Sequence, residues 1–537
     1  MLCVVKKMNS MKKDLKILLI QPPLTHYGED SNAGAVSFPI NLLSVLSYVK
    51  KHGYENIMIE DFMFTKEKIR KRLANDSVRI GVDDTEIEKK IRESKPDIVG
   101  VSCVFTRYFM DSHSIASITK KINPEVKVIF GGTHATNFWQ ETLTDKNVDL
   151  VVIGEGELTF LDLLNKYSEN QSIQDVPGIA YRNNKGKPIK TGVREPLDIK
   201  TLPILDYASL DMKRYITFNE DYQMKTPSFQ LSTSRGCPMD CIYCSVKTVW
   251  GHKWRGKTPD QVLDEIEYLQ KNFGIKEISF LDDSISVDPH RFKAICQGII
   301  DRGLKIYWST PNGIAHWTLN KEILLLMRRA GCYRITFGIE SGNNEIRKFI
   351  GKPFDLAQAK ELLQYANKIG MWTVITTIFG FPYETKEKIM DTVNFALSCG
   401  VDYAAFYKLT PYPDAPLYKI MREEKLLNFD AMIDPNSQNA RLISNFLSAE
   451  VRTRHLSNKE LDDLVGFATK KFLKNKILRY VFRPWEVFYK VYSKDSLLYT
   501  LKIVISVIKL VFRSIYYGRF DVTMLRKKQK EKKYNNE

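Results

Sequence analysis

The sequence predicts an α/β protein with two parallel-sheet regions followed by a helical region. In the first part of the chain, short apolar runs of strand length alternate with helical patterns, as in a doubly wound parallel sheet. From Ser228 onward a strand and then a helix recur about every 30 to 35 residues, which is the period of a βα-barrel unit. The pattern then becomes helical. We therefore expect an N-terminal domain at 14–155, a connector at 156–227, a barrel at 228–415 and a helical C-terminal region at 416–537.

Five apolar runs define the first sheet. Residues 16–20 read as a buried strand that ends at Gln21-Pro22-Pro23, because proline cannot continue a central strand. A helix is expected from about residue 40 to residue 52, with Gly53 as its stop. The other four strands are expected at residues 56–61, 97–102, 127–132 and 149–154.

Ligands of such a sheet bind beyond the carboxyl ends of its strands. Those ends carry turns rich in proline, serine and glycine, namely Gln21-Pro22-Pro23, residues 102–105, Gly131-Gly132-Thr133-His134 and Gly154-Glu155-Gly156-Glu157. No G-x-G-x-x-G follows the first strand and no Walker A motif occurs, so a dinucleotide or a nucleoside triphosphate is not expected.

The connector holds a predicted hairpin near residues 176–182, and six strand patterns follow it. They lie at 229–233, 277–281, 305–309, 334–339, 373–379 and 403–408. Six strand–helix units are enough for a partial (β/α)6 barrel, whose active site would assemble at the carboxyl ends of the strands.

Three cysteines follow the first barrel strand. Cys237, Cys241 and Cys244 are spaced C-x3-C-x2-C in a segment with glycine and proline but no helical period, so their thiolates can converge from one loop. A four-iron cluster normally takes four cysteines, and no fourth lies nearby, which leaves one iron open. Zinc is the rival, but it usually takes four protein ligands or three plus water, and no second C-x2-C or His-x3-His accompanies the motif.

This spacing, with the aromatic Tyr243 before the last cysteine, resembles the signature of the radical S-adenosylmethionine (SAM) superfamily. The resemblance implies a [4Fe-4S] cluster whose open iron is chelated by SAM, and an electron that splits SAM into methionine and a 5'-deoxyadenosyl radical. It also implies SAM contacts at the strand ends, from Asp282, Asp283, Glu340, Ser341 and Gly380. For Asp283 and Ser341, a helix N-cap is the alternative role. No catalytic acid or base is assigned.

The N-terminal half resembles the cobalamin-binding domain attached to many radical SAM proteins. The resemblance rests on the two turns that follow the fourth and fifth strands and implies cobalamin contacts from Gly131, Gly132, Thr133, Gly154 and Glu155. The D-x-H-x-x-G motif that supplies a histidine to cobalt is missing after the first strand, so we expect cobalamin without a protein histidine ligand. The alternative is a sheet that only packs against the catalytic half.

Together the two resemblances, which cover residues 14 to 415, predict a cobalamin-dependent C-methyltransferase that acts on an unactivated carbon. An anaerobic oxidative cyclase or other ring-forming radical SAM enzyme is the first alternative, and a cobalamin or redox sensor is the non-enzyme alternative. A methylthiotransferase is disfavoured, because the N-terminal domain has only Cys3 and Cys103. The expected partners are a small-molecule substrate, lipid or isoprenoid among the candidates, and an electron donor such as a ferredoxin or flavodoxin.

The charge distribution and one amphipathic segment bear on whether the protein contacts nucleic acid or a membrane. The net charge is +17, but residues 496–537 hold ten Lys or Arg against three Asp or Glu, so the charge is largely a property of the tail and nucleic acid is not expected. Residues 497–517 form an amphipathic pattern in which Lys502, Lys509 and Arg513 share one side. This helix and the basic run 526–533 suit the surface of an anionic membrane. A helix docked on the barrel is the alternative. The cysteine content and the short apolar run at the start indicate a cytoplasmic protein, or one peripheral at the inner face of the membrane.

Overall fold

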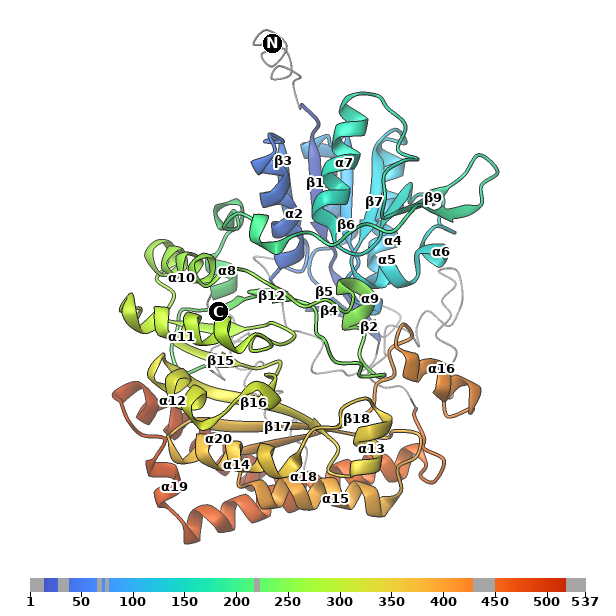
Figure 1. Cartoon of the computed structure of the whole chain (residues 1–537). Coiled ribbons are helices and arrows are strands. Elements are labelled where there is room, and N and C mark those ends of the chain that lie inside the picture. The colour runs from blue at the N-terminus through green and yellow to red at the C-terminus, as the bar shows by residue number, and fades with distance from the viewer. Residues whose placement is uncertain are drawn as a thin grey trace. The chain divides into compact units, whose positions relative to one another are not determined.

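The computed structural model describes residues 14–27, 38–64, 70–72, 77–216, 223–427 and 450–517 (Figure 1). These residues form two compact units. The first comprises the described residues through Asp211, and the second those from Met212 onward.

The first unit is built on a seven-stranded sheet in the order β10-β9-β8-β7-β6-β1-β3. The five predicted parallel strands are confirmed, and the doubly wound sheet with them. They are β1 (Ile17–Gln21), β3 (Ile57–Asp61), β6 (Ile98–Ser102), β7 (Lys127–Gly131) and β8 (Leu150–Val152). Because β1 lies between β3 and β6, the winding direction reverses at β1 and β6, where such sheets bind ligands.

Helices cover this sheet. Helices α2 (Ile40–Lys51) and α7 (Gly156–Ser168) lie side by side (Figure 1), and Ser44 Oγ of α2 donates a 2.5 Å hydrogen bond to Glu157 Oε1 of α7. Helices α3 (Asp84–Ser94) and α4 (Phe109–Ile122) also pack together. Two short helices follow β7, α5 (Thr133–Asn137) and α6 (Trp139–Thr142).

The hairpin expected near residues 176–182 is longer than predicted: β9 (Ile179–Arg182) lies in that range, but its partner β10 (Pro188–Lys190) lies beyond it. The two add antiparallel strands to the sheet. The first unit therefore continues past the expected boundary at residue 155. The Arg182 guanidinium fastens the hairpin by donating to the carbonyl oxygens of Leu143 at 2.8 Å and Val148.

A second, three-stranded sheet in this unit has the order β2-β5-β4, from β2 (Leu24–Tyr27), β4 (Arg70–Arg72) and β5 (Ser77–Ile80). The sequence analysis missed it, because β4 and β5 are short and mostly polar. Asp111 of α4 fixes β2 by accepting hydrogen bonds from the Thr25 backbone N–H at 2.7 Å and from Thr25 Oγ1 at 2.8 Å.

The second unit contains the predicted six-stranded parallel sheet in the order β11-β14-β15-β16-β17-β18. Its strands are β11 (Ser228–Leu231), β14 (Glu277–Phe280), β15 (Tyr307–Thr310), β16 (Cys332–Glu340), β17 (Trp372–Phe379) and β18 (Tyr403–Lys408). The helices between them are α10 (Pro259–Phe273), α11 (Pro289–Asp301), α12 (Lys321–Arg329), α13 (Asn344–Phe349), α14 (Leu356–Lys368) and α15 (Lys386–Cys399). This is the partial (β/α)6 barrel that the repeat predicts.

Local signals explain where these helices begin and end. A capping box between Thr258 and Gln261 begins α10, and Gly274, at φ +64°, ends it. Asp288, Asn320, Asp355 and Thr385 cap the starts of α11, α12, α14 and α15 with their side chains.

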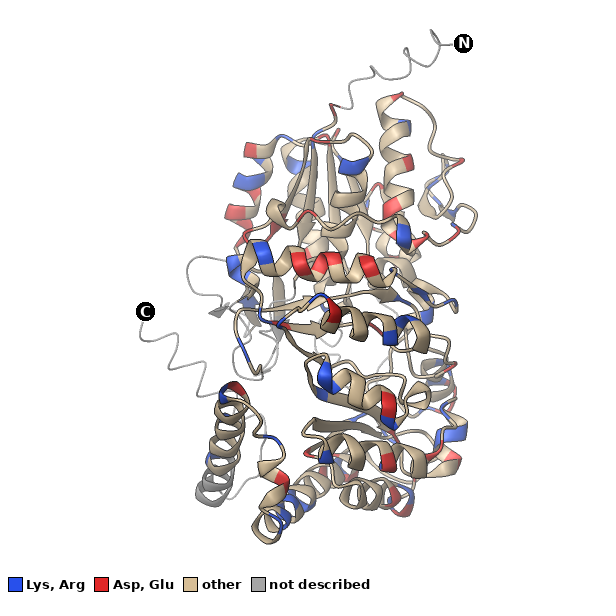
Figure 2. Ribbon diagram, turned by 60° about the vertical axis from the view of Figure 1, so that its left-hand side comes forward, with Lys and Arg blue, Asp and Glu red and all other residues tan. Residues whose placement is uncertain are grey.

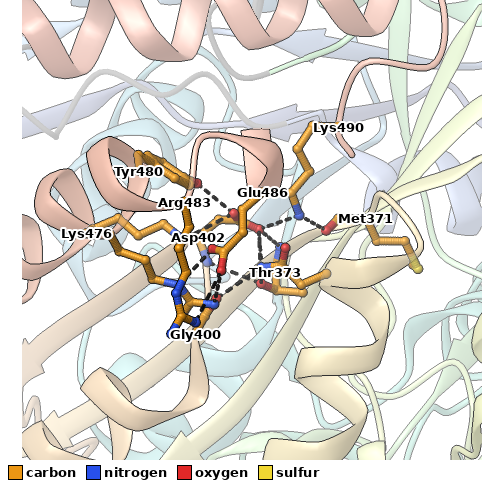
Figure 3. A network of polar contacts seen from close by, with 11 residues as sticks. Met371, Thr373, Gly400, Asp402, Lys476, Tyr480, Arg483, Glu486 and Lys490 are labelled. Atoms are coloured by element: carbon orange, nitrogen blue, oxygen red, sulfur yellow. Dashed lines mark hydrogen bonds and ion pairs between the residues drawn. The ribbon is translucent and has the colours of Figure 1, made fainter. Parts of the chain in front are cut away.

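The described residues of the C-terminal region contain the helices α16 (Pro416–Glu423), α18 (Asn458–Phe482), α19 (Trp485–Phe488) and α20 (Lys494–Tyr517). A buried carboxylate ties it to the amino ends of β17 and β18 (Figure 3). Asp402 accepts from Lys490 Nζ at 2.9 Å and from Tyr480 OH at 2.8 Å, and Lys476 Nζ lies at 3.5 Å. The basic run 526–533 lies outside the described residues. Within them, no helix has the length and hydropathy that crossing a bilayer requires.

Candidate active site

The cysteine motif lies in a loop that follows β11. A short antiparallel pairing of β12 (Ser234–Arg235) with β13 (Arg255–Gly256) closes the base of the loop, and α9 (Val246–Trp250) lies within it. Gly236 has φ +85°, and a Cβ there would come within 2.9 Å of the Lys253 carbonyl oxygen, so the turn before Cys237 requires glycine.

Backbone hydrogen bonds fix the middle of the loop. The Ile242 N–H donates to the Ile350 carbonyl at 3.2 Å, and the Ile242 carbonyl accepts from the Leu417 N–H at 2.8 Å. The Tyr243 ring packs against Phe381 with centroids 5.8 Å apart. The motif is therefore held against the segments that follow α13 and β17.

The three thiols of the motif are free and partly or fully buried. Burial raises the pKa of Cys237 and of Cys241, and it raises the pKa of Cys244 to about 11. The charge of Cys241 further raises the pKa of both other thiols. Three free thiols on one loop fit a cluster that takes cysteine thiolates as ligands.

The grouping is not that of a single-ion site. Among the residues that the structure describes, no three His, Cys, Asp or Glu side chains gather closely enough to bind one metal ion. A four-iron cluster has several iron atoms for its cysteines, so its ligands need not converge on one point.

A buried ion pair lies beside the cysteines. Lys352 Nζ is 2.8 Å from Glu340 Oε1, and Glu340 ends β16 in the left-handed region at φ +60°. The Lys352 ammonium lowers the pKa of Cys237 and Cys241, opposing the effect of burial. Gly338 makes room for the pair, since a Cβ there would lie 2.6 Å from Glu340 Oε1 and 2.9 Å from Lys352 Nζ. Lys352 thus brings positive charge to a site of several thiolates.

The two aspartates after β14 differ in their contacts. Asp282 accepts from the Thr233 N–H at 3.1 Å, from Thr233 Oγ1 at 2.8 Å and from Ser234 Oγ, so it joins β14 to the start of the motif loop. Burial and the charge of Asp282 raise the pKa of Asp283 to about 6. The charge of Asp283 in turn raises the pKa of Cys237 and Cys244. The Asp283 carboxylate is hydrogen-bonded to the backbone of Gly236, the residue before Cys237.

Ser341 and Gly380, the other predicted SAM contacts, sit in turns with internal partners. Ser341 Oγ accepts from the Asn343 N–H at 3.2 Å and lies 3.4 Å from Thr392 Oγ1. Gly380, at φ +112°, donates its N–H to Glu384 Oε2 at 2.7 Å. Burial raises the pKa of Glu384 to about 8, and its Oε1 has no hydrogen-bond partner in the structure.

Several buried polar atoms near the carboxyl ends of β14 and β15 lack hydrogen-bond partners in the part of the chain that the structure describes. They are both ring nitrogens of His316, Thr310 Oγ1 and Ser284 Oγ. The His316 ring is stacked on Phe337 at 4.9 Å and lies edge-on to Phe354 at 4.2 Å. Burial, followed by the charge of Lys352, lowers the pKa of His316 to about 3, so the ring is neutral. Atoms of this kind suit a polar ligand, since buried polar groups normally have partners.

The predicted cobalamin contacts lie at the carboxyl ends of β7 and β8. A Cβ at Gly131 would meet no atom within 4 Å, so the backbone is open there. Gly132, at φ +100°, is different, because a Cβ would lie 2.8 Å from the Cys103 carbonyl. The Gly154 N–H donates to Thr136 Oγ1 at 3.0 Å, while Thr133 begins α5 and Glu155 precedes α7. Open backbone beside the winding reversal fits a large planar ligand.

His134 follows these residues but is enclosed. Its ring is stacked on Phe138 at 4.9 Å and lies edge-on to Phe109 at 5.3 Å. Its Nδ1 lies 3.2 Å from Thr106 Oγ1, and burial lowers its pKa to about 3. His113 is engaged as well, with Nδ1 2.6 Å from Asp145 Oδ2.

Sequence reasoning missed Lys352, His316 and Glu384. Lys352 and Glu384 lie in turns after α13 and β17, where a single charged residue gives no signal. His316 stands beside Trp317 in a segment with no motif. A search for charged residues just after barrel strands could have found Glu384.

Two family models match the chain. The radical SAM superfamily model covers residues 231–396, and the B12 binding domain model covers residues 31–164. An uncharacterized methyltransferase of Pyrococcus horikoshii is 33% identical over 421 residues, which cover 77% of this chain and 85% of the relative. The chain belongs to the radical SAM superfamily. It is a radical SAM enzyme with an N-terminal B12-binding domain, and its cofactors are a [4Fe-4S] cluster, SAM and cobalamin.

More distant relatives and solved structures agree with this membership. Cytidylyl-2-hydroxyethylphosphonate methyltransferase of Streptomyces wedmorensis is 28% identical, covering 78% of this chain and 87% of the relative. The structure of the radical SAM methyltransferase TsrM of Kitasatospora setae, with cobalamin and a [4Fe-4S] cluster bound, has a TM-score of 0.64 at 15% identity and covers 85% of this chain and 90% of TsrM. The cobalamin-dependent SAM radical enzyme OxsB has a TM-score of 0.64 at 17% identity and covers 97% of this chain and 84% of OxsB. The shared fold extends over both units.

Proposed function

We propose that the chain is a cobalamin-dependent C-methyltransferase that transfers a methyl group to an unactivated carbon of a small molecule. The observation that carries the proposal is the pairing of a loop with three free cysteines and a B12-binding domain in one chain. Relatives named as methyltransferases, in Pyrococcus horikoshii and Streptomyces wedmorensis, support it.

The residues take the following roles in this proposal. Cys237, Cys241 and Cys244 hold the cluster, and Lys352 offsets part of its negative charge. Asp283, which is hydrogen-bonded to the Gly236 backbone, and Glu340, which pairs with Lys352, contact the amino group and the ribose or methionine part of SAM. The turn at Gly380 approaches its adenine. Gly131, Gly132, Thr133, Gly154 and Glu155 contact cobalamin. When bound, the cluster would supply the electron that cleaves SAM, and cobalamin would carry the methyl group.

The test separates methyl transfer from SAM cleavage. The full chain is reconstituted anaerobically with iron, sulfide and hydroxocobalamin, desalted, and incubated with SAM and a reduced ferredoxin or flavodoxin. We expect near-stoichiometric cobalamin per chain, 5'-deoxyadenosine, and S-adenosylhomocysteine from methylation of the cobalamin. A loaded protein that makes 5'-deoxyadenosine but no S-adenosylhomocysteine would overturn the methyltransferase assignment.

A second candidate is an oxidative cyclase. The anaerobic magnesium-protoporphyrin IX monomethyl ester cyclase of Rubrivivax gelatinosus is 26% identical, covering 87% of this chain and 79% of the relative. Such an enzyme needs the radical but no methyl transfer, so in the same test it would make 5'-deoxyadenosine without S-adenosylhomocysteine.

The substrate class we favour is a lipid or isoprenoid. A hopanoid C-3 methylase of Methylococcus capsulatus is 25% identical over 289 residues, covering 53% of this chain, and the C-terminal helix α20 presents apolar side chains to the solvent. Incubating the loaded enzyme with ¹⁴C-methyl SAM and a total lipid extract, and counting label in the organic phase, checks this choice. Label only in the aqueous phase would contradict it.

A further inference from the structure

The C-terminal helix α20 uses one of its faces to dock on the second unit. Ser496, Tyr499 and Thr500 are buried. The Tyr499 ring packs edge-on against Tyr333, with centroids 5.4 Å apart, and against Trp372 at 5.6 Å. Asp495 pairs with Lys225 through Nζ and Oδ1 at the start of the helix. The orientation of the first turns of the helix is therefore set by the protein itself.

A different face of α20 is apolar and exposed. Its six residues are each between 36% and 49% exposed, namely Leu497, Leu498, Leu501, Val504, Ile505 and Ile508. At 100° per residue these positions fall within an arc of about 120°, so they form a single stripe. Few charges interrupt the helix, which is largely tan in Figure 2. Contiguous exposed apolar surface on this scale marks an interaction site.

Positive charge borders the apolar stripe. Lys502 and Lys509 are exposed, and at 100° per residue they lie beside its edge. Residues 518–537, which follow the helix in the sequence, contain seven Lys or Arg and three Asp or Glu. An apolar stripe with lysines at its edge has the composition of helices that lie in the interface of an anionic membrane.

We propose that the exposed face of α20 binds the surface of an anionic lipid bilayer. Leu501 and Ile505, at the centre of the stripe, enter the boundary between head groups and acyl chains, while Lys502 and Lys509 pair with lipid phosphates. The helix lies along the surface and does not cross the bilayer, since no described helix meets the length and hydropathy of a membrane span. A second copy of the chain suits this face less well than an anionic surface, because each copy carries a net charge of +17 and lysines at the edge of the stripe.

The proposal is independent of the catalytic assignment, because vesicle binding needs neither cofactor nor substrate. The full chain is sedimented with vesicles of phosphatidylcholine alone and of phosphatidylcholine with phosphatidylglycerol. Leu501→Ser/Ile505→Ser removes two central apolar side chains, and we expect its partition onto the anionic vesicles to fall by about tenfold or more. Lys502→Gln/Lys509→Gln should reduce binding to the anionic vesicles and leave binding to the pure phosphatidylcholine vesicles unchanged.

A matched control removes the same side chains elsewhere. Leu325 on α12 is 44% exposed and Ile204 is 42% exposed, so Leu325→Ser/Ile204→Ser deletes equally exposed apolar groups outside α20. We expect unchanged vesicle binding for this control and unchanged circular dichroism for every variant. Equal loss of binding in the control and the α20 variant would overturn the proposal. A second result would also overturn it: a wild-type chain that stays in the supernatant with both kinds of vesicle and forms a dimer that the α20 substitutions dissociate.

Discussion

The two ends of the barrel sheet differ in whether their buried polar groups find hydrogen-bond partners. At the amino ends of β17 and β18, the Asp402 carboxylate accepts from the Thr373 N–H at 2.8 Å and from Thr373 Oγ1 at 3.0 Å, besides its contacts with Tyr480, Lys476 and Lys490 (Figure 3). At the carboxyl ends of β14 and β15, buried polar atoms such as the two ring nitrogens of His316 have no hydrogen-bond partner among the described residues.

The difference separates stability from function. A buried polar atom without a partner costs about 1–3 kcal/mol. Trp372 Nε1 at the amino end of β17 is one such atom among the described residues, but the Asp402 carboxylate there is satisfied by residues of α18 and of the segment after α19, and these charges act on the stability of the second unit. At the carboxyl end several unpartnered atoms lie together, as suits a ligand-binding site. The carboxyl end, with the cysteine loop and the Glu340–Lys352 pair, is left open to ligands.

The largest effect is expected at the carboxyl end. Cys241→Ser removes one thiolate ligand, so iron per chain should fall and 5'-deoxyadenosine formation should become undetectable, while the circular dichroism stays that of the wild type. Cys399→Ala is the control, since Cys399 is buried at the end of α15, away from the motif. If the Cys241→Ser variant still cleaves SAM, the cluster is not bound by this loop.

At the amino end the expected effect is on stability. Asp402→Asn leaves Lys476 and Lys490 buried without their counter-charge, which should lower the free energy of unfolding by about 3–5 kcal/mol. Asp495→Asn, which removes a partly exposed ion pair with Lys225, should cost at most about 1 kcal/mol. Tryptophan fluorescence during thermal unfolding suits the measurement, because six of the seven tryptophans lie in the second unit.

The comparison between the two variants decides the role of Asp402. Equal unfolding midpoints for Asp402→Asn and Asp495→Asn would mean that the buried network does not anchor the C-terminal helices. The 5'-deoxyadenosine formed per folded molecule should be the same in both variants, since neither residue lies at the carboxyl end.

Glu384 gives the carboxyl end a pH dependence. Its pKa is about 8 in the fold, above its ordinary value of 4.5, because the carboxyl group is buried. The folded state therefore binds this proton more tightly than the unfolded state, and stability falls as pH rises from about 4.5 to about 8. Glu384→Gln keeps the hydrogen bonds to the Gly380 and Phe381 N–H groups without a titrating proton. In the wild type the free energy of unfolding should fall by a few kcal/mol between pH 4.5 and pH 8, and the Glu384→Gln variant should not show this fall.

Unfolding midpoints at pH 5, 6.5 and 8 measure this slope. Glu345→Gln is the control, because Glu345 is exposed and its Lys388 partner lowers its pKa below the ordinary value. Parallel pH profiles for wild type and Glu384→Gln would show that Glu384 does not titrate as the structure indicates.

Local patterns predicted the parts of the fold that depend on neighbouring residues. Apolar runs with helical intervals located all the parallel strands of the two large sheets, because burial on both faces leaves a continuous apolar signal. The cysteine loop was visible as well, since its ligands lie within eight residues of sequence.

Pairings made by the tertiary fold could not be predicted. Asp402 meets Lys490 across 88 residues, and Glu340 meets Lys352 only because α13 turns the chain back between them. The α20 pattern favoured a docked helix and a membrane helix about equally. The structure shows why, since a buried face and an exposed apolar face occur on the same helix.

The smallest effect is expected at the carboxyl end of the first sheet, and it extends the comparison to cobalamin. A methyl group at Gly131 meets nothing in the protein, so Gly131→Ala should leave the unfolding midpoint unchanged. If cobalamin lies against this backbone, the same methyl group should crowd it and weaken retention by about 1–3 kcal/mol. Gly192→Ala also adds a methyl group in open space, but away from the strand ends, and should retain cobalamin fully. Equal retention of cobalamin by both variants after desalting would place cobalamin away from Gly131. The two substitutions add the same methyl group in open space and differ only in its position on the unit.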